Sequence, residues 1–320
     1  MKQGYWHIVW RQFRKRRLAV AGLYLIVLLF LVAILAPFIA GNKPILIWSD
    51  DGLKTGVFMS DRELRDIVPR ARCTIYPPIP YSPTQYDLEE RLEPPSGKHL
   101  LGTDDRGRDI ASRMVHGARI SLSVGFVAVS IFVALGIVTG SFAGYYGGWL
   151  DALISRIIEV WLCFPTLFLI LAALAVLPQS IYIIMVVIGL TGWTGVARLV
   201  RGEFLKLRPQ DFVAASRAVG AGGGRIMFRH ILPNALGPVL VSATFGVAAA
   251  ILVESALSFL GFGVPPPTPS WGDTLSQARN YMDFAWWLAL FPGMAIFVTI
   301  TAYNLVGEGL RDSIDPRLTQ

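Results

Sequence analysis

Residues 11–40 read RQFRKRRLAVAGLYLIVLLFLVAILAPFIA, in which five basic residues precede an apolar run from Leu18 to Ala40. At about 1.5 Å per residue, a helix of this length crosses a hydrocarbon core of roughly 30 Å. The run is too long for the apolar region of a signal peptide, and no small-residue cleavage site precedes Pro37. We therefore expect an uncleaved membrane-spanning helix at 18–40, with the basic segment 1–17 in the cytoplasm.

The rest of the chain has the composition of a polytopic membrane protein. Of its 320 residues, 53% are hydrophobic and 16% are charged, and the mean hydropathy is +0.52. These values exclude a disordered chain, a fibrous repeat and a disulfide-stapled secreted module. Further apolar blocks lie at 118–144, 152–177, 181–200, 236–258 and 286–306, so we predict an all-α fold with six transmembrane helices. A buried or re-entrant helix is the alternative for 181–200, which contains three glycines.

Charge assigns the connecting segments to the two sides of the membrane. Residues 41–117 carry 11 basic and 12 acidic residues and many prolines. We expect them to form an extracytoplasmic insert, because long loops translocate whatever their charge. Residues 118–320 then form a core domain with five helices, whose segment 201–235 carries six basic residues against two acidic ones and lies in the cytoplasm, as does the C-terminus. The net charge of +7 follows this rule, so no nucleic-acid partner is expected.

Small residues recur every four positions in two of the predicted helices, which predicts close helix packing. The two series are Gly136, Gly140 and Gly144, and Ser242, Gly246 and Ala250. The second series continues to Glu254, an ionisable residue within a predicted span, which makes it a candidate for a functional polar group. The alternative is that Glu254 lies at headgroup level or forms hydrogen bonds to a helix end.

The sequence contains no pattern for catalysis or for a resident cofactor. Gly97-Lys98 lacks the preceding glycine and the following Ser/Thr of a phosphate-binding loop, so ATP is not expected to bind this chain. The four histidines and two cysteines have no metal-ligand spacing, so no metal site is expected. Asp104, Asp105 and Asp109 alternate with arginines, which favours a salt-bridged turn over a calcium loop.

The segment from Arg208 to Gly220 predicts a short cytoplasmic helix. Pro209 and Asp211 are typical of a helix start, and Gly220 can take the left-handed conformation that ends a helix. One face would present Phe212, Ala215, Ser216 and Val219, an aromatic ring among small residues that suits a groove on another protein. A second helix from about Arg225 to Leu232 would end before Pro233. The alternative is a solvated connecting loop.

This loop resembles the cytoplasmic coupling loop, often called the EAA loop, of ABC-importer permeases. With the glycine and the Leu-Pro ending aligned, the three letters fall on Ala214, Ala215 and Ser216, so the sequence departs from the pattern at the first and third. The resemblance implies a loop that couples the spans to ATPase subunits. Its residues are Asp211, Phe212, Ala214, Ala215, Ser216, Arg217, Gly220, His230, Leu232 and Pro233.

Other motifs are similar to those of the dipeptide and oligopeptide branch of this family. They are LGTDDRGRD at 101–109, SFLGFG at 258–263, PPTPSWG at 266–272, GLRD at 309–312 and DPRL at 315–318. The resemblance covers the first span and residues 100–320, whereas 41–99 match nothing that we can assign. It implies a type I importer fold in the bacterial inner membrane and a passive permease that imports peptides. The branch also contains importers of nickel and other non-peptide solutes.

The resemblance also implies partners. These are a second homologous permease, two cytoplasmic ATPase subunits that carry ATP and Mg²⁺, and an extracytoplasmic substrate-binding protein. A different reading is a secondary transporter driven by an ion gradient, with Glu254 as the coupling carboxylate, but the expected paired broken helices are absent from the sequence. A membrane enzyme lacks any pairing of nucleophile and base in the insert.

Overall fold

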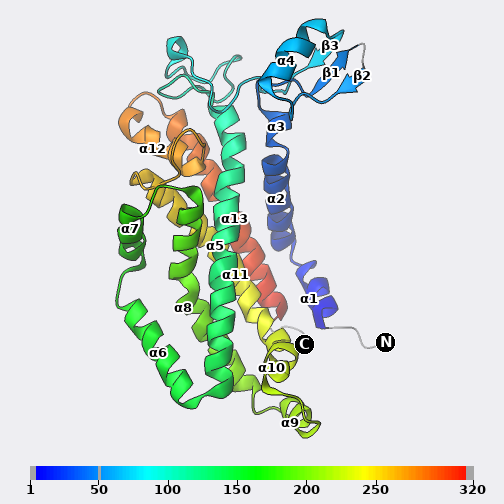
Figure 1. Cartoon of the computed structure of the whole chain (residues 1–320), viewed down its shortest axis with the longest axis vertical. Helices are drawn as coiled ribbons and strands as arrows, with labels where there is room; N and C mark the ends of the chain where they lie inside the picture. The colour runs from blue at the N-terminus through cyan, green and yellow to red at the C-terminus, as the bar shows by residue number, and fades with distance from the viewer. Residues whose placement is uncertain (1–4, 50–51, 315–320) are drawn as a thin grey trace. The chain divides into compact units, whose positions relative to one another are not determined.

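The structure is a computed structural model that describes residues 5–49 and 52–314 (Figure 1). The chain divides into two compact units, one of residues 1–26, 124–253 and 299–320, the other of residues 27–123 and 254–298. Four helices contribute residues to both units: α2 (Arg17–Ile34), α5 (Ile110–Tyr146), α11 (Leu232–Phe259) and α13 (Trp287–Ile314).

In its described residues the first unit contains helices and their connecting turns but no strand. Besides parts of the four long helices it contains α1 (Tyr5–Phe13), α6 (Gly148–Leu162), α7 (Thr166–Val176), α8 (Ile181–Leu207), α9 (Asp211–Ala218), α10 (Gly223–Arg225) and a π-helical segment, η3 (Ile226–Ile231). The last two run without a break into α11, so residues 223–259 form one apolar helical run.

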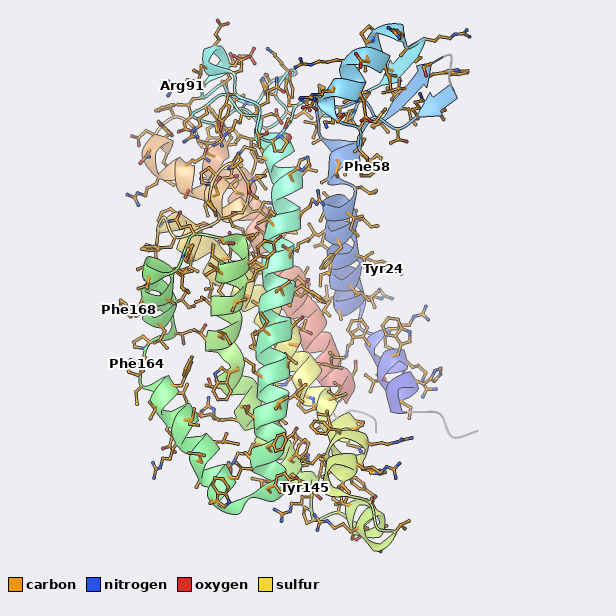
Figure 2. The ribbon with its side chains drawn as sticks, viewed as in Figure 1. Tyr24, Phe58, Arg91, Tyr145, Phe164 and Phe168 are labelled. Carbon is orange, nitrogen blue, oxygen red and sulfur yellow. The ribbon has the colours of Figure 1, made fainter. Side chains whose placement is uncertain are left out.

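Within residues 5–49 and 52–314, five helices are long and apolar enough to cross a membrane, and a sixth crossing is made if α6 and α7 count as one bent span. These two helices meet at 81° around Pro165. Proline lacks the backbone N–H and disfavours helical geometry in the preceding residue, which ends α6 at this point. Phe164 and Phe168 flank the break with exposed rings (Figure 2).

The sharp break lies in the block 152–177 and not in 181–200, the block for which a buried or re-entrant helix is the alternative. Residues 181–200 belong to α8, a continuous helix of 27 residues. Two of its glycines provide contact surface: a Cβ on Gly189 would lie 2.7 Å from the Cβ of Ile131, and one on Gly192 would lie 3.1 Å from the ring of Phe132. The small residues thus allow α5 to approach α8 closely.

The second unit contains the small sheet of the predicted insert. Antiparallel strands β1 (Leu46–Ser49), β2 (Gly52–Lys54) and β3 (Cys73–Ile75) have the order β2-β1-β3, with Ile47 opposite Lys54 on one side and Thr74 on the other. Ile47 on the central strand is fully buried. The connection carries α4 (Asp61–Ile67), where Ser60 and Glu63 form a capping box, and the 3₁₀ turn η1 (Val68–Arg70).

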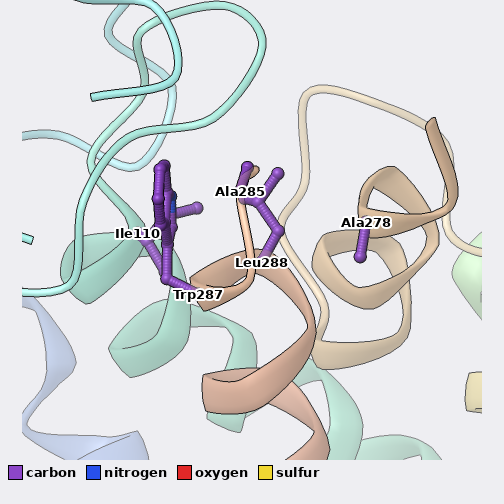
Figure 3. Packing of buried hydrophobic residues seen from close by; sticks show 5 residues of the cluster. All are labelled: Ile110, Ala278, Ala285, Trp287 and Leu288. Atoms are coloured by element: carbon purple, nitrogen blue, oxygen red, sulfur yellow. The ribbon is translucent and has the colours of Figure 1, made fainter. Parts of the chain in front are cut away.

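The remainder of the second unit surrounds the start of α5. It comprises α3 (Ala36–Ile39), the 3₁₀ turn η2 (Leu88–Glu90), α12 (Trp271–Tyr281) and the adjoining ends of the long helices. Ile110 packs with Trp287 and Leu288 in a buried cluster that also holds Ala278 and Ala285 (Figure 3). Because α5 begins at Ile110, the last residues of segment 41–117 already belong to this helix.

Candidate coupling site

The segment 208–233 folds as a short helix, a turn and the π-helical start of α11. Helix α9 begins at Asp211 and ends in a Schellman motif: the N–H of Gly220 donates to the carbonyl of Arg217, and that of Ala221 donates to the carbonyl of Ser216. Gly220 has a φ of +82°, the left-handed conformation that the motif requires. The short helix predicted from Asp211 to Gly220 is thus present in the structure.

The exposed side of α9 carries small residues beside the charged Asp211 and Arg217. Ala214, Ala215, Ala218 and Val219 are exposed, and Val219 retains 88% of its accessible surface. Phe212 and Ser216 are half-buried, and the Ser216 hydroxyl donates to the carbonyl of Phe212. Of the four residues predicted to face a partner, only Ala215 and Val219 are therefore exposed. Val213, which is fully buried, anchors α9 on the rest of the chain. No local pattern in the sequence distinguishes Val213 as this anchor.

A hollow of about 510 Å³ opens between α9 and the segment that follows it. Its lining combines small and basic side chains: Ala215, Ser216, Val219, Gly220, Ala221, Arg225, Arg229 and His230. Arg217 and Asp211 are exposed nearby on α9 itself. The surface therefore combines an apolar, small-residue helix with a predominantly basic border.

The end of α5 supports the turn. The guanidinium of Arg217 lies 5.8 Å from the ring centroid of Tyr145, and a Cβ on Gly223 would lie 3.3 Å from the same ring. Figure 2 labels Tyr145 at this end of α5. Such a cation–π contact contributes about 0.5–1 kcal/mol at an exposed site. Tyr145 was not predicted as a site residue, because the pairing joins segments more than seventy residues apart.

The predicted stop before Pro233 is wrong. Residues 226–231 form a π-helical segment whose buried side chains include Ile226 and Ile231, and α11 continues through Pro233. The N–H of Leu232 donates to the carbonyl of Met227, five residues earlier, and the Asn234 side chain donates to the carbonyl of His230. The widened turn thus passes a proline without ending the helix.

The glycine series of α5 lies against α8. There is no space for a Cβ at any of its three glycines: a Cβ would lie 2.5 Å from Val196 at Gly136, 2.4 Å from the carbonyl of Ala197 at Gly140, and 2.5 Å from Phe204 at Gly144. In the second series, Gly246 contacts the ring of Phe132 and Ala250 is buried. Ser242 instead lines a separate hollow of about 730 Å³ beside Phe245.

Comparisons with known proteins agree with this architecture. Residues 136–320 match the family described as binding-protein-dependent transport system inner membrane component, and residues 4–51 match the N-terminal transmembrane domain of oligopeptide transport permease C. The chain belongs to this permease family. The inward-facing MetNI methionine ABC transporter has a similar fold, with a TM-score of 0.52 and 17% identity over 63% of this chain and 95% of that chain.

Curated relatives resemble the permease along nearly its whole length. It is 38% identical to the dipeptide transport system permease protein DppC of Alkalihalophilus pseudofirmus, over 98% of this chain and 90% of the relative. Identity to the oligopeptide transport system permease protein OppC of Bacillus subtilis is 36% over the same shares. Identity to the glutathione transport system permease protein GsiD of Escherichia coli is 38%, over 98% of this chain and 91% of the relative.

Glu254 of the permease is fully buried in the second unit, where it accepts hydrogen bonds from two serines. The hydroxyls of Ser258 and Ser270 each lie 2.9 Å from Oε1. Ser270 is also the N-cap of α12, because its hydroxyl accepts the N–H of Asp273. Glu254 thus stabilises the start of α12 through Ser270. This agrees with the alternative in which Glu254 forms hydrogen bonds to a helix end.

The motif at 101–109 forms a buried charge network, as the predicted salt-bridged turn required. Arg108 Nε donates to Asp104 Oδ2 at 2.6 Å, and Arg113 pairs with Asp273 of α12 at 2.5 Å. Burial raises the pKa of Asp273, although Arg113 opposes the shift. The pair Arg113–Asp273 leaves no local signal in the sequence, because 160 residues separate the two side chains. No cluster of three or more metal-ligating side chains occurs within residues 5–49 and 52–314.

Proposed function

We propose that the permease forms one half of the translocation pathway of an ATP-driven peptide importer. The curated relatives named above are permeases for dipeptides, oligopeptides and glutathione, all of which are peptides. The other half of the pathway is a second homologous permease. Two ATPase subunits bind ATP and Mg²⁺, and an extracytoplasmic binding protein delivers the substrate.

The exposed surface of α9 is the main support for this proposal. A passive permease must receive motion from another subunit, and the exposed alanines of α9 offer a close-fitting contact that long side chains would prevent. The basic hollow beside it suits acidic side chains of the partner. In this arrangement the Schellman turn at Gly220 and the π-helical segment connect the docked helix to α11.

The orientation follows from the same assignment. Segment 201–235 and both termini lie in the cytoplasm, and the insert lies outside, where it is available to the binding protein. Ion-gradient coupling through Glu254 receives no support from the site, because its Oε1 is engaged by Ser258 and Ser270 within a structural cluster. A nickel importer is likewise not favoured by any group of ligands in the described residues.

Reconstitution of the complete complex tests the proposal. Proteoliposomes with both permeases and the ATPases should hydrolyse ATP faster when peptide-loaded binding protein is added to the outer face. Peptide uptake should require ATP and should continue in the presence of a protonophore. Uptake that persists without ATP and stops with the protonophore would contradict it.

A further inference from the structure

The N-terminal helix and the last helix of the permease enclose an apolar hollow that the coupling mechanism does not use. Its volume is about 220 Å³, and its lining consists of Val9, Trp10, Phe13, Leu23, Val306 and Leu310. No polar surface contributes to the lining. These residues come from α1, the second turn of α2 and the last third of α13.

Close helix contacts hold the walls of this hollow in place. A Cβ on Gly309 would lie 2.2 Å from the Cβ of Ala19, and one on Gly22 would lie 2.8 Å from the carbonyl of Ala302. Arg16, in the turn between α1 and α2, forms an ion pair of 3.2 Å with Asp312. These contacts hold α2 against α13, and the ring of Phe13 of α1 also lies beside Gly309, 3.2 Å from where its Cβ would be.

The turn that joins α1 to α2 places positive charge beside the apolar lining. Arg11, Arg14, Lys15 and Arg17 are exposed, and within the described residues 5–49 and 52–314 only Arg16 of this basic cluster forms an ion pair. The nearby end of α13 adds exposed Arg311 and one exposed carboxylate, Glu308. Positive charge is thus in excess where the spanning helix α2 begins.

We propose that this hollow binds an acyl chain of an anionic phospholipid of the cytoplasmic leaflet, whose phosphate contacts Arg14 and Lys15. An apolar hollow at a membrane boundary suits lipid tails, and juxtamembrane basic clusters attract anionic headgroups. Trp10, which is half exposed on the wall of the hollow, is typical of the interfacial region. The choice of leaflet rests on the orientation proposed above.

The test uses the complete complex in nanodiscs that contain phosphatidylcholine together with a trace of photoactivatable lipid. The probe is phosphatidylglycerol with a diazirine near the end of one acyl chain, and cross-linked peptides are identified by mass spectrometry. We expect labelling of peptides that contain Leu23 or Leu310. The double variant Arg14→Gln, Lys15→Gln should reduce that labelling roughly tenfold or more.

Three controls keep the result specific. The matched double variant Arg62→Gln, Arg65→Gln removes two basic side chains of α4 and should label normally. Leu23→Trp fills the hollow and should reduce labelling while the charges remain. Soluble glycerol phosphate should not compete, because it lacks a chain.

Equal labelling by the same probe with a phosphatidylcholine headgroup would overturn the proposal, as would unchanged labelling in the Arg14→Gln, Lys15→Gln variant. Competition by glycerol phosphate would assign the basic turn to a soluble anion and would also contradict it. Labelling of a single cysteine by an impermeant reagent tests the orientation separately, so failure of the lipid site leaves the transport proposal intact.

Discussion

At the scale of single residues, Gly220 shows how local chemistry shapes the candidate coupling site. Its φ of +82° lets two N–H groups satisfy the last carbonyls of α9, while a Cβ at this position would have open space around it. The requirement for glycine is therefore conformational and not steric. A left-handed conformation costs an ordinary residue about 1–2 kcal/mol, and a β-branched residue more.

We predict that Gly220→Val disturbs the entry into α10 and η3 and leaves the spans unaffected. The variant should insert normally and co-purify with the second permease, but it should lose the ATPase subunits or their substrate-dependent stimulation. Gly222→Ala is the matched control, because Gly222 has an ordinary φ of −68°. A Gly220→Val complex with unchanged coupling would show that the turn need not be left-handed.

Glu254 gives a second prediction at this scale. Oε1 accepts both serine hydroxyls and Oε2 has no hydrogen-bond partner among the described residues, so Glu254→Gln keeps the acceptor that matters. Assembly and transport should remain near normal. Glu254→Ala should lower the thermal stability of the complex, because each buried hydroxyl left without its acceptor costs about 1–3 kcal/mol. Glu254→Gln that assembles but does not transport would assign the charge a mechanistic role.

Local patterns made some of these residues predictable from sequence. The helix start at Asp211 and the stop at Gly220 follow from neighbouring residues alone, and both are present in the structure. Partners distant in the chain were not predictable. Ser270 reaches Glu254 across a loop, and Tyr145 meets Arg217 from another helix, so neither contact leaves a local signal.

At the scale of elements, the glycine series of α5 determines how closely it packs on α8. Gly140→Ala should destabilise the helix pair, because the new Cβ would lie 2.4 Å from a backbone carbonyl that cannot rotate away. Overpacking of this kind typically costs about 1–3 kcal/mol. Gly202→Ala on α8 is the control, since its Cβ would meet nothing within 4 Å. Thermal unfolding in detergent measures the difference, and equal midpoints for the two variants would contradict it.

The segment before α5 contains a pH-dependent element. His99 is buried between two carboxylates, with Nδ1 2.8 Å from Asp109 and Nε2 2.8 Å from Glu90. Burial opposes the protonated ring, but the hydrogen bonds to Asp109 and Glu90 outweigh it and raise the pKa of His99. The unfolded pKa is about 6.5, so the stabilisation is complete below that pH and is lost as pH rises through the folded pKa.

We therefore predict that hydrogen exchange at residues 88–109 becomes faster as pH rises above about 6.5, after correction for the intrinsic rate. His99→Gln should flatten this dependence, and His230→Gln, in the other unit, should not. If hydrogen exchange in the wild type does not depend on pH, then His99 keeps one protonation state across this pH range, which contradicts the prediction.

Sequence periodicity located most spans but not their irregularities. Apolar blocks identified the long helices because burial in lipid requires them, whereas the start of α5 at Ile110 depends on tertiary packing with Trp287. The break between α6 and α7 falls at Pro165, whereas α8 continues through its glycines, of which Gly189 and Gly192 pack against α5. Proline at 233 did not end a helix, since the π-helical segment accommodates it.

At the scale of the whole molecule, the orientation is a prediction that chemical labelling can check. Cys73 and Cys163 are both exposed in the isolated chain, but Cys163 lies at the break within the bent span. In intact cells an impermeant maleimide should label Cys73 and should not label cysteines introduced at Arg14, Arg208 or Arg311. Labelling at Arg208 from outside would reverse the topology.

Ala215→Arg tests the proposal that α9 docks the ATPase subunits. Ala215 is exposed and lines the basic hollow, so arginine adds both volume and like charge where the partner must approach, while the spans are untouched. The measurement is ATP hydrolysis by the reconstituted complex with and without peptide-loaded binding protein, with Ala215→Ser as the small-residue control. We predict normal insertion and permease pairing, full stimulation with serine and its loss with arginine. Undiminished stimulation in the Ala215→Arg complex would contradict the proposal.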